Sequence, residues 1–179
     1  MRIVTLIALV LLTAQALDIS SLIKAYKNKN YAFVCKKGYK LFDKLRKDEN
    51  LITMYAFSCL RIDYIDRLAV PILILGKTPQ SRNNRAYFSL ILTQKNILTS
   101  ALFDGAKFEG LHIPKTDYIL SKVFNLYFQK KYKKTDNVYI MQDPTDKVTY
   151  EMSVKKDRYG KVLFIKEIRP NKTTIHQYR

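Results

Sequence analysis

Apolar residues recur at steps of three and four over two neighbouring stretches, residues 31–45 and 51–62. This spacing gives a helix one apolar face, so each stretch predicts an amphipathic helix. A polar break at residues 46–50 separates them and predicts a turn. The sequence therefore predicts an antiparallel helical hairpin near the start of the chain.

Each predicted helix of the hairpin carries one cysteine. Cys35 lies twelve residues before the centre of the polar break, and Cys59 lies twelve residues after it. At 1.5 Å per residue, both sulfurs lie about 18 Å from the turn and at the same height. We expect a Cys35–Cys59 disulfide, and the alternative is a pair of buried free thiols. The small residues that favour such close packing are Ala32, Gly38 and Ala56.

The first sixteen residues have the pattern of a secretory signal peptide. Arg2 supplies a positive charge, residues 3–12 are almost wholly apolar, and residues 14–16 have the small-x-small form of a cleavage site. We expect cleavage after Ala16 and a periplasmic or secreted location, which favours disulfide formation. No later stretch approaches the roughly 20 apolar residues of a spanning helix, so we expect no transmembrane segment after cleavage.

The same periodicity predicts a helical domain over residues 17–134. Its first part, residues 17–75, contains the hairpin region and ends in a helix that Pro71 should kink or split. Residues 76–85 are rich in Gly, Pro, Ser and Asn and predict a linker. Two longer helices are expected over residues 86–134.

Near residue 137 the period changes from helical to alternating. Residues 148–155 place apolar side chains at every second position, which predicts a half-buried strand. Companion strands are expected at residues 138–142, 162–168 and 173–178. The fold class is therefore predicted to be α+β, with a four-stranded antiparallel meander over residues 137–179 packed on the last helix.

The net charge of +17 favours anionic binding partners. Candidate contacts with an anionic partner are Lys36, Lys37, Lys40, Lys130, Lys131, Lys133 and Lys134. For an exported protein, anionic lipid, polysaccharide or an acidic protein is the expected partner, and nucleic acid is not. The alternatives are a solvated basic face that serves solubility, and a lysine-rich composition that has no role in binding.

Residues with catalytic chemistry are sparse. Neither His112 nor His176 lies in a nucleophile motif, and no metal-ligand run or phosphate loop occurs. Pairs of aspartates have structural interpretations: Asp63 and Asp66 as helix caps, Asp143 and Asp146 as turn residues. We predict no catalytic residue, no metal and no cofactor. An exported hydrolase that uses either histidine remains the least favoured alternative.

The stretch from residue 19 to residue 75 resembles tetratricopeptide or Sel1-like repeats. The residues that carry the resemblance are Leu22, Tyr26, Asn30, Cys35 and Tyr39. A second clean period and the closing proline of such repeats are missing. The stapled helix pair also resembles the secreted cysteine-rich Sel1-like proteins of the Helicobacter group, although their cysteines are more closely spaced. The chain as a whole resembles small periplasmic proteins of the Helicobacter and Campylobacter lineage.

The resemblance implies protein or peptide binding in a helical groove, with no cofactor and no catalytic residue. We therefore expect an exported, non-enzymatic interaction or scaffold module that binds an envelope protein or peptide. The main alternative is a basic electrostatic binder of envelope polyanions such as anionic lipid or lipopolysaccharide.

Overall fold

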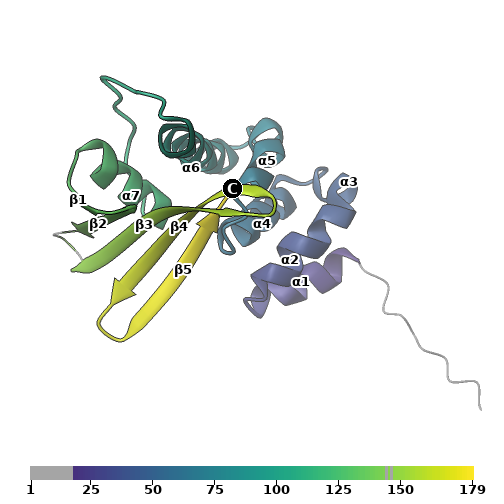
Figure 1. Ribbon diagram of the computed structural model, residues 1–179. Helices are drawn as coiled ribbons and strands as arrows, with labels where there is room; N and C mark the ends of the chain where they lie inside the picture. Colours follow the sequence, from purple (N-terminus) through teal and green to yellow (C-terminus); the bar gives the residue numbers. More distant parts are fainter. Residues whose placement is uncertain (1–17, 144, 146) are drawn as a thin grey trace, which may run out of the picture.

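The computed structural model describes residues 18–143, 145 and 147–179, and the predicted signal peptide lies outside them. Helices come first in the chain and an antiparallel sheet follows, which confirms the α+β class (Figure 1). The helical elements are α1 (Ile19–Lys27), α2 (Tyr31–Gly38), η1 (Tyr39–Leu41), α3 (Phe42–Leu45), α4 (Glu49–Leu60), η2 (Ile65–Leu68), α5 (Ala69–Ile74), α6 (Pro79–Asp104) and α7 (Ile119–Phe128). The strands are β1 (Lys133–Thr135), β2 (Val138–Asp143), β3 (Val148–Asp157), β4 (Gly160–Arg169) and β5 (Lys172–Tyr178).

The predicted disulfide is present between α2 and α4. The Cα atoms of Cys35 and Cys59 lie 4.8 Å apart, and both cysteines are fully buried. Gly38 allows this close approach, because a Cβ there would lie only 2.8 Å from a ring carbon of Tyr55. Ala56 is buried as expected, whereas Ala32 is exposed and does not face the partner helix. The hairpin and its staple are therefore confirmed, with one of the three small residues wrongly placed.

The helix expected before α6 is split at the proline. Residues 65–68 form the short 3₁₀ helix η2, and α5 follows with Pro71 in its first turn. Proline lacks a backbone N–H, and that donor has no partner in the first turn of a helix, so Pro71 is tolerated there.

The linker predicted at residues 76–85 is wrong for most of its length, because α6 already begins at Pro79. Thr78 caps the helix: its hydroxyl accepts from the N–H of Ser81, and the hydroxyl of Ser81 accepts from the N–H of Thr78. Proline in the first helical turn needs no hydrogen-bond partner. The polar residues that suggested a linker are therefore the start of a capped helix.

The sheet is a meander with the order β1-β2-β3-β4-β5, one strand more than predicted. The added strand β1 pairs Lys133 and Lys134 with Ile140 and Tyr139 of β2. The last helix ends earlier than expected because Lys130 adopts a left-handed conformation, and the N–H of Lys131 donates to the carbonyl of Leu126. This Schellman-type ending turns the chain back toward the sheet.

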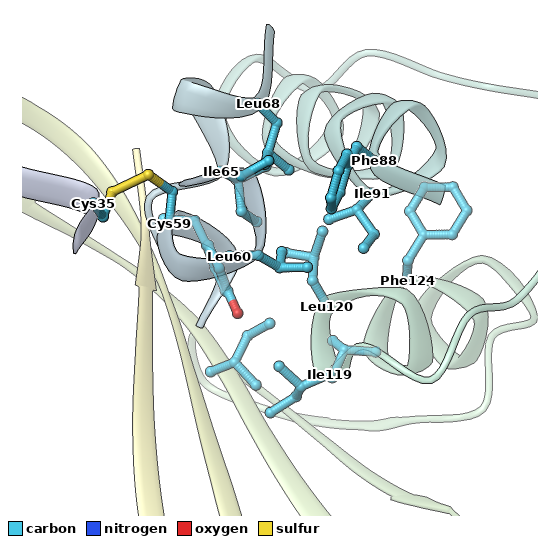
Figure 2. Close-up of a cluster of buried hydrophobic side chains, with 14 of the residues drawn as sticks. Cys35, Cys59, Leu60, Ile65, Leu68, Phe88, Ile91, Ile119, Leu120 and Phe124 are labelled. Atoms are coloured by element: carbon cyan, nitrogen blue, oxygen red, sulfur yellow. A yellow bond between two sulfur atoms is a disulfide. The ribbon is translucent and has the colours of Figure 1, made fainter. Parts of the chain in front are cut away.

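One hydrophobic core joins the helices to the sheet. Figure 2 shows side chains of α4, η2, α6 and α7 converging beside the disulfide. In β3 the buried residues Val148, Tyr150 and Met152 occupy every second position, as expected for a strand with one face on the core. Among the described residues, no helix is both long and apolar enough to cross a membrane.

We predict that Cys35→Ser, or reduction of the wild type, lowers the melting temperature. Opening this loop should cost about 3 kcal/mol, which corresponds to roughly 6–12 °C for a chain of this size. Thermal unfolding followed by circular dichroism, with and without reductant, measures the shift. In the Cys35→Ser variant the thiol of Cys59 should also become open to alkylation on partial unfolding. Identical melting curves under both conditions would contradict the prediction.

Candidate functional site: a polar cluster beside a cleft

Asp63 lies where α4 ends and the chain turns toward η2. It has a positive φ of 63°, and the next N–H, that of Tyr64, donates to the carbonyl of Cys59 over 3.0 Å. These are the features of a Schellman ending, in which glycine usually takes the left-handed position. Aspartate tolerates this conformation better than most residues. The local fold thus presents a carboxylate at the negative end of a helix, where a carboxylate is electrostatically unfavourable.

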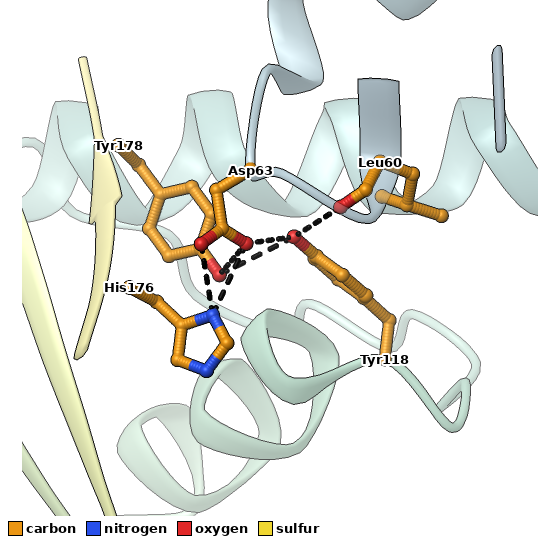
Figure 3. Close-up of polar contacts among 5 residues, drawn as sticks. All are labelled: Leu60, Asp63, Tyr118, His176 and Tyr178. Carbon is orange, nitrogen blue, oxygen red and sulfur yellow. Dashed lines mark hydrogen bonds and ion pairs between the residues drawn. The ribbon is translucent and has the colours of Figure 1, made fainter. Parts of the chain in front are cut away.

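Three side chains from distant parts of the chain donate hydrogen bonds to this carboxylate (Figure 3). The hydroxyl of Tyr118 lies 2.6 Å from Oδ1, the hydroxyl of Tyr178 lies 3.2 Å from Oδ1, and Nδ1 of His176 lies 2.9 Å from Oδ2. The Tyr118 hydroxyl is also 3.3 Å from the carbonyl of Leu60 at the end of α4, which accepts from the N–H of Asp63 as well. This polar cluster, Asp63, Tyr118, His176 and Tyr178, therefore ties α4 to α7 and to β5.

The strand period accounts for two members of the polar cluster. His176 and Tyr178 are two residues apart in β5, so their side chains lie on the same face of the sheet. They pair with Ile165 and Leu163 of β4, which are both fully buried. The two side chains thus lie beside buried apolar residues of β4 and reach the carboxylate of Asp63 with their polar atoms.

Burial and charge fix the protonation of the two tyrosines. Burial raises the pKa of Tyr118 far above the usual value, and the neighbouring Asp63 carboxylate raises it further. Burial likewise raises the pKa of Tyr178, with Tyr118 and Asp63 as further causes. Both hydroxyls therefore stay protonated and act as donors throughout the physiological range.

His176 is held in one orientation. A carboxylate only accepts hydrogen bonds, so Nδ1 carries the donated proton and Nε2 of the neutral ring is an acceptor. Nε2 is buried and has no hydrogen-bond partner among the residues that the structure describes. An aspartate that orients a histidine in this way is the arrangement found beside nucleophiles in hydrolases.

A cleft of about 590 Å³ opens next to the polar cluster. Its walls come from α4, α6, the start of α7 and β5, and its lining residues are Phe57, Leu60, Arg61, Asp63, Asn83, Asn84, Tyr87, Asp117, Tyr118, Ile119 and His176. The hydroxyl of Tyr87 donates to Asp117 over 2.7 Å. Burial and the Asp117 carboxylate raise the pKa of Tyr87, so this hydroxyl also stays a donor. The guanidinium of Arg61 makes no ion pair with any described residue and is exposed.

The side chains that line the cleft are mostly polar, charged or aromatic. It includes no serine, threonine or cysteine that could act as a nucleophile for His176. Within residues 18–143, 145 and 147–179, no group of three His, Cys, Asp or Glu side chains could hold a metal ion. What the cleft offers is a guanidinium, two carboxylates, two amides, an imidazole and aromatic surface.

The residues predicted as candidate contacts do not form one site. Lys36, Lys37 and Lys40 are exposed on α2 and η1, whereas the Lys130 to Lys134 group is exposed at the end of α7 and on β1. Figure 1 places α2 and β1 at opposite sides of the molecule. His112 is exposed in the loop before α7 and lines a different hollow from His176.

The capping roles predicted for two aspartates are wrong. The carboxylate of Asp63 belongs to the polar cluster, and that of Asp66 makes an ion pair over 2.7 Å with Lys95, whose side chain is only 9% exposed. In both cases a distant donor competes successfully with the nearby N–H groups. Asp143 does close a turn, since it accepts from the N–H and hydroxyl of Thr145, while Asp146 lies outside the described residues.

We predict that Tyr118→Phe destabilises the protein by about 1.5–3 kcal/mol, the usual value of a hydrogen bond to a charged group. Urea unfolding measures this difference. Tyr159→Phe is the matched control, because Tyr159 is 72% exposed and outside the polar cluster, and it should change stability by less than about 0.5 kcal/mol. Equal stabilities of the two variants would show that the Tyr118 hydroxyl does not stabilise the fold.

Comparison of this chain with protein-family models, with curated proteins and with solved structures finds no match. The function must therefore be inferred from the geometry and charge of the molecule itself.

Proposed function

We propose that this protein is an exported, non-enzymatic interaction module that binds a protein or peptide partner in the cleft beside the polar cluster. The observation that carries the proposal is the cleft itself, which is formed by four elements and has the unpaired Arg61 at its wall. Its volume of about 590 Å³ is in the range typical of ligand sites. The disulfide and the absence of a membrane-spanning helix among the described residues support export of the protein.

The chemistry of the lining favours a polypeptide over a simple anion. Arg61 offers donors to a carboxylate or a carbonyl, and the side-chain amide of Asn83 offers both a donor and an acceptor. Asp117 adds a negative charge on the same cleft, which would repel a polyanion. Aromatic surface from Phe57 and Tyr87, whose ring centroids lie 6.1 Å apart, suits an apolar side chain.

The walls of the cleft are held in place before any partner binds. The disulfide fixes α4 one turn before Asp63, and the polar cluster then fixes the end of α4 against α7 and β5. A preformed site loses less conformational entropy on binding than a flexible one. This rigidity supports a binding role that needs no rearrangement of the fold.

We predict that filling the cleft abolishes peptide binding. Peptides selected by display against the exported protein should bind Asn83→Phe at least tenfold more weakly, because the added ring occupies the cleft. The matched control is Asn96→Phe on the same helix, since Asn96 is also exposed but does not line the cleft. Isothermal titration measures both affinities.

Arg61→Ala tests the charge of the same site. The variant should bind peptides that carry a carboxylate near the bound segment more weakly than wild type does. Its affinity for neutral peptides should change little. If both Phe variants bind like the wild type, the peptide site lies elsewhere and the proposal fails.

A second candidate function is electrostatic binding of an envelope polyanion. The observation in its favour is that Lys130, Lys131, Lys133 and Lys134 are all exposed, and none makes an ion pair with a described residue. Lys134 lies over the ring of Tyr139, 5.1 Å from its centroid, which leaves its charge available at the surface. Such a group attracts anions mainly through charge, so its affinity depends on salt.

For this candidate we predict that affinity for dextran sulfate falls steeply between about 0.01 and 0.15 M salt, as the Debye length shortens from about 30 Å to 8 Å. Replacing the four lysines by glutamine should remove most of that affinity in fluorescence titrations. Replacing Lys36, Lys37 and Lys40 by glutamine in a separate variant shows which of the two predicted lysine groups binds dextran sulfate. Affinity that is independent of salt would exclude the electrostatic mechanism.

A further inference from the structure

The short helix α5 directs apolar side chains into solvent. Leu73 is 82% exposed and Val70 is 49% exposed, the largest and third-largest fractions among the exposed aliphatic residues described. In the same helix Pro71 is buried, so one side of α5 packs on the protein and the other has no cover from any described residue. Exposed leucine in isolation is common, but two such residues on one turn form a local apolar tip.

Aromatic and basic groups continue the surface on one side of this tip. Arg67 lies in η2, about one turn before Val70, and its guanidinium also donates to the carbonyl of Cys35 over 2.6 Å. The guanidinium of Arg67 lies over the rings of Tyr39 and Tyr64, 5.1 and 5.3 Å from their centroids. Both rings are exposed, by 65% and 44%. Tyrosine is favoured where an apolar environment meets water.

Three cations follow α5 along the chain. Lys77 follows α5 closely, Arg82 donates to the carbonyls of Gly76 and Lys77, and the Arg85 side chain packs over Gly76. Lys77, Arg82 and Arg85 are all exposed, and none makes an ion pair with a described residue. The carboxylate of Glu49 accepts from the N–H groups of Gly76 and Lys77 and adds one negative charge beside these residues. This basic collar, Lys77, Arg82 and Arg85, therefore sets three positive charges against the single carboxylate of Glu49.

We propose that the α5 tip and its basic collar dock on the surface of an anionic lipid bilayer. Leu73 and Val70 enter the boundary between head groups and acyl chains, the collar contacts lipid phosphates, and the two tyrosines lie at the level of the head groups. Apolar side chains next to a group of cations are the combination that binds such surfaces. No helix of the described residues is long and apolar enough to span the bilayer, so the contact is peripheral.

Charge distinguishes a lipid surface from a second copy of this chain. Two copies that met through their α5 tips would bring two basic collars together, and each chain carries a net charge of +17. Repulsion between like charges opposes that contact, whereas anionic lipid neutralises it. The proposal goes beyond the cleft, with which the tip and the collar share no residue.

The first experiment is vesicle flotation of the exported form of the protein. Wild type should bind vesicles of phosphatidylcholine with phosphatidylglycerol at least tenfold more strongly than vesicles of phosphatidylcholine alone. The double variant Val70→Ser/Leu73→Ser should lose at least tenfold in binding to the anionic vesicles. Both side chains are already exposed, so these changes leave the core intact. Ile175→Ser is the apolar control, because Ile175 is 59% exposed on β5 and lies outside the tip and the collar, and it should bind like wild type.

Two charge variants distinguish vesicle binding through this surface from vesicle binding through the lysines near β1. Lys77→Gln/Arg85→Gln should weaken vesicle binding, while Lys130→Gln/Lys131→Gln should do so less, although both variants lose two charges. If the second pair has the larger effect, general electrostatic attraction explains the binding and the α5 proposal is overturned.

The absence of tryptophan from the chain permits a direct test of insertion. Leu73→Trp should show a blue-shifted emission with anionic vesicles and protection from a water-soluble quencher, whereas Ile175→Trp should show neither. An unchanged Leu73→Trp spectrum would overturn the proposal. So would equal binding of wild type and the serine double variant, or sedimentation showing a dimer that Leu73→Ser dissociates. Peptide binding by Asn83→Phe reports on the cleft independently, so the two proposals can fail separately.

Discussion

The carboxylate of Asp63 is the contact on which the arrangement of this protein depends. It lies at the carbonyl end of α4, where the helix dipole alone would disfavour a negative charge. Donors from Tyr118, His176 and Tyr178 offset that cost, and each comes from a segment more than fifty residues away in the sequence. The Asp63 side chain is only 18% exposed. Because a carboxylate that is largely removed from water requires partners, the cluster selects one relative position of α4, α7 and β5.

The disulfide and the polar cluster act on the same helix. Cys59 fixes α4 to α2, and Asp63, one turn later, fixes the end of α4 to α7 and the sheet. A further contact restrains the same region: Arg67 donates to the carbonyl of Cys35 over 2.6 Å and joins η2 to α2. A helix restrained on several sides makes a stable wall, and the cleft beside it is therefore defined before a partner arrives. This is the physical basis for the proposed binding role.

The molecule presents three surfaces of different character. The cleft combines charges of both signs with aromatic surface, the lysines near β1 offer charge alone, and the α5 tip combines aliphatic side chains with cations. A polypeptide, a polyanion and an anionic lipid surface are the respective ligands that such chemistry favours. A module that binds a partner in its cleft while resting on a membrane would use the first and third of these together.

Local pattern was sufficient to predict the helical hairpin, the pairing of Cys35 with Cys59 and four of the five strands, because helix and strand periods and symmetric spacing are properties of neighbouring residues. Strand β1 was missed because its three residues are all exposed and show no alternation. The start of α6 was missed although Thr78, Pro79 and Ser81 form a capping motif, since the same residue types also favour linkers. The polar cluster could not be predicted from one sequence: Asp63 resembles a helix cap until distant donors are placed around it. The alternation of His176 and Tyr178 indicated a shared face, but not what that face meets. The sequence alone therefore determined most of the elements and the staple, whereas the cleft and the exposed α5 tip arise from long-range packing, which only the tertiary structure decides.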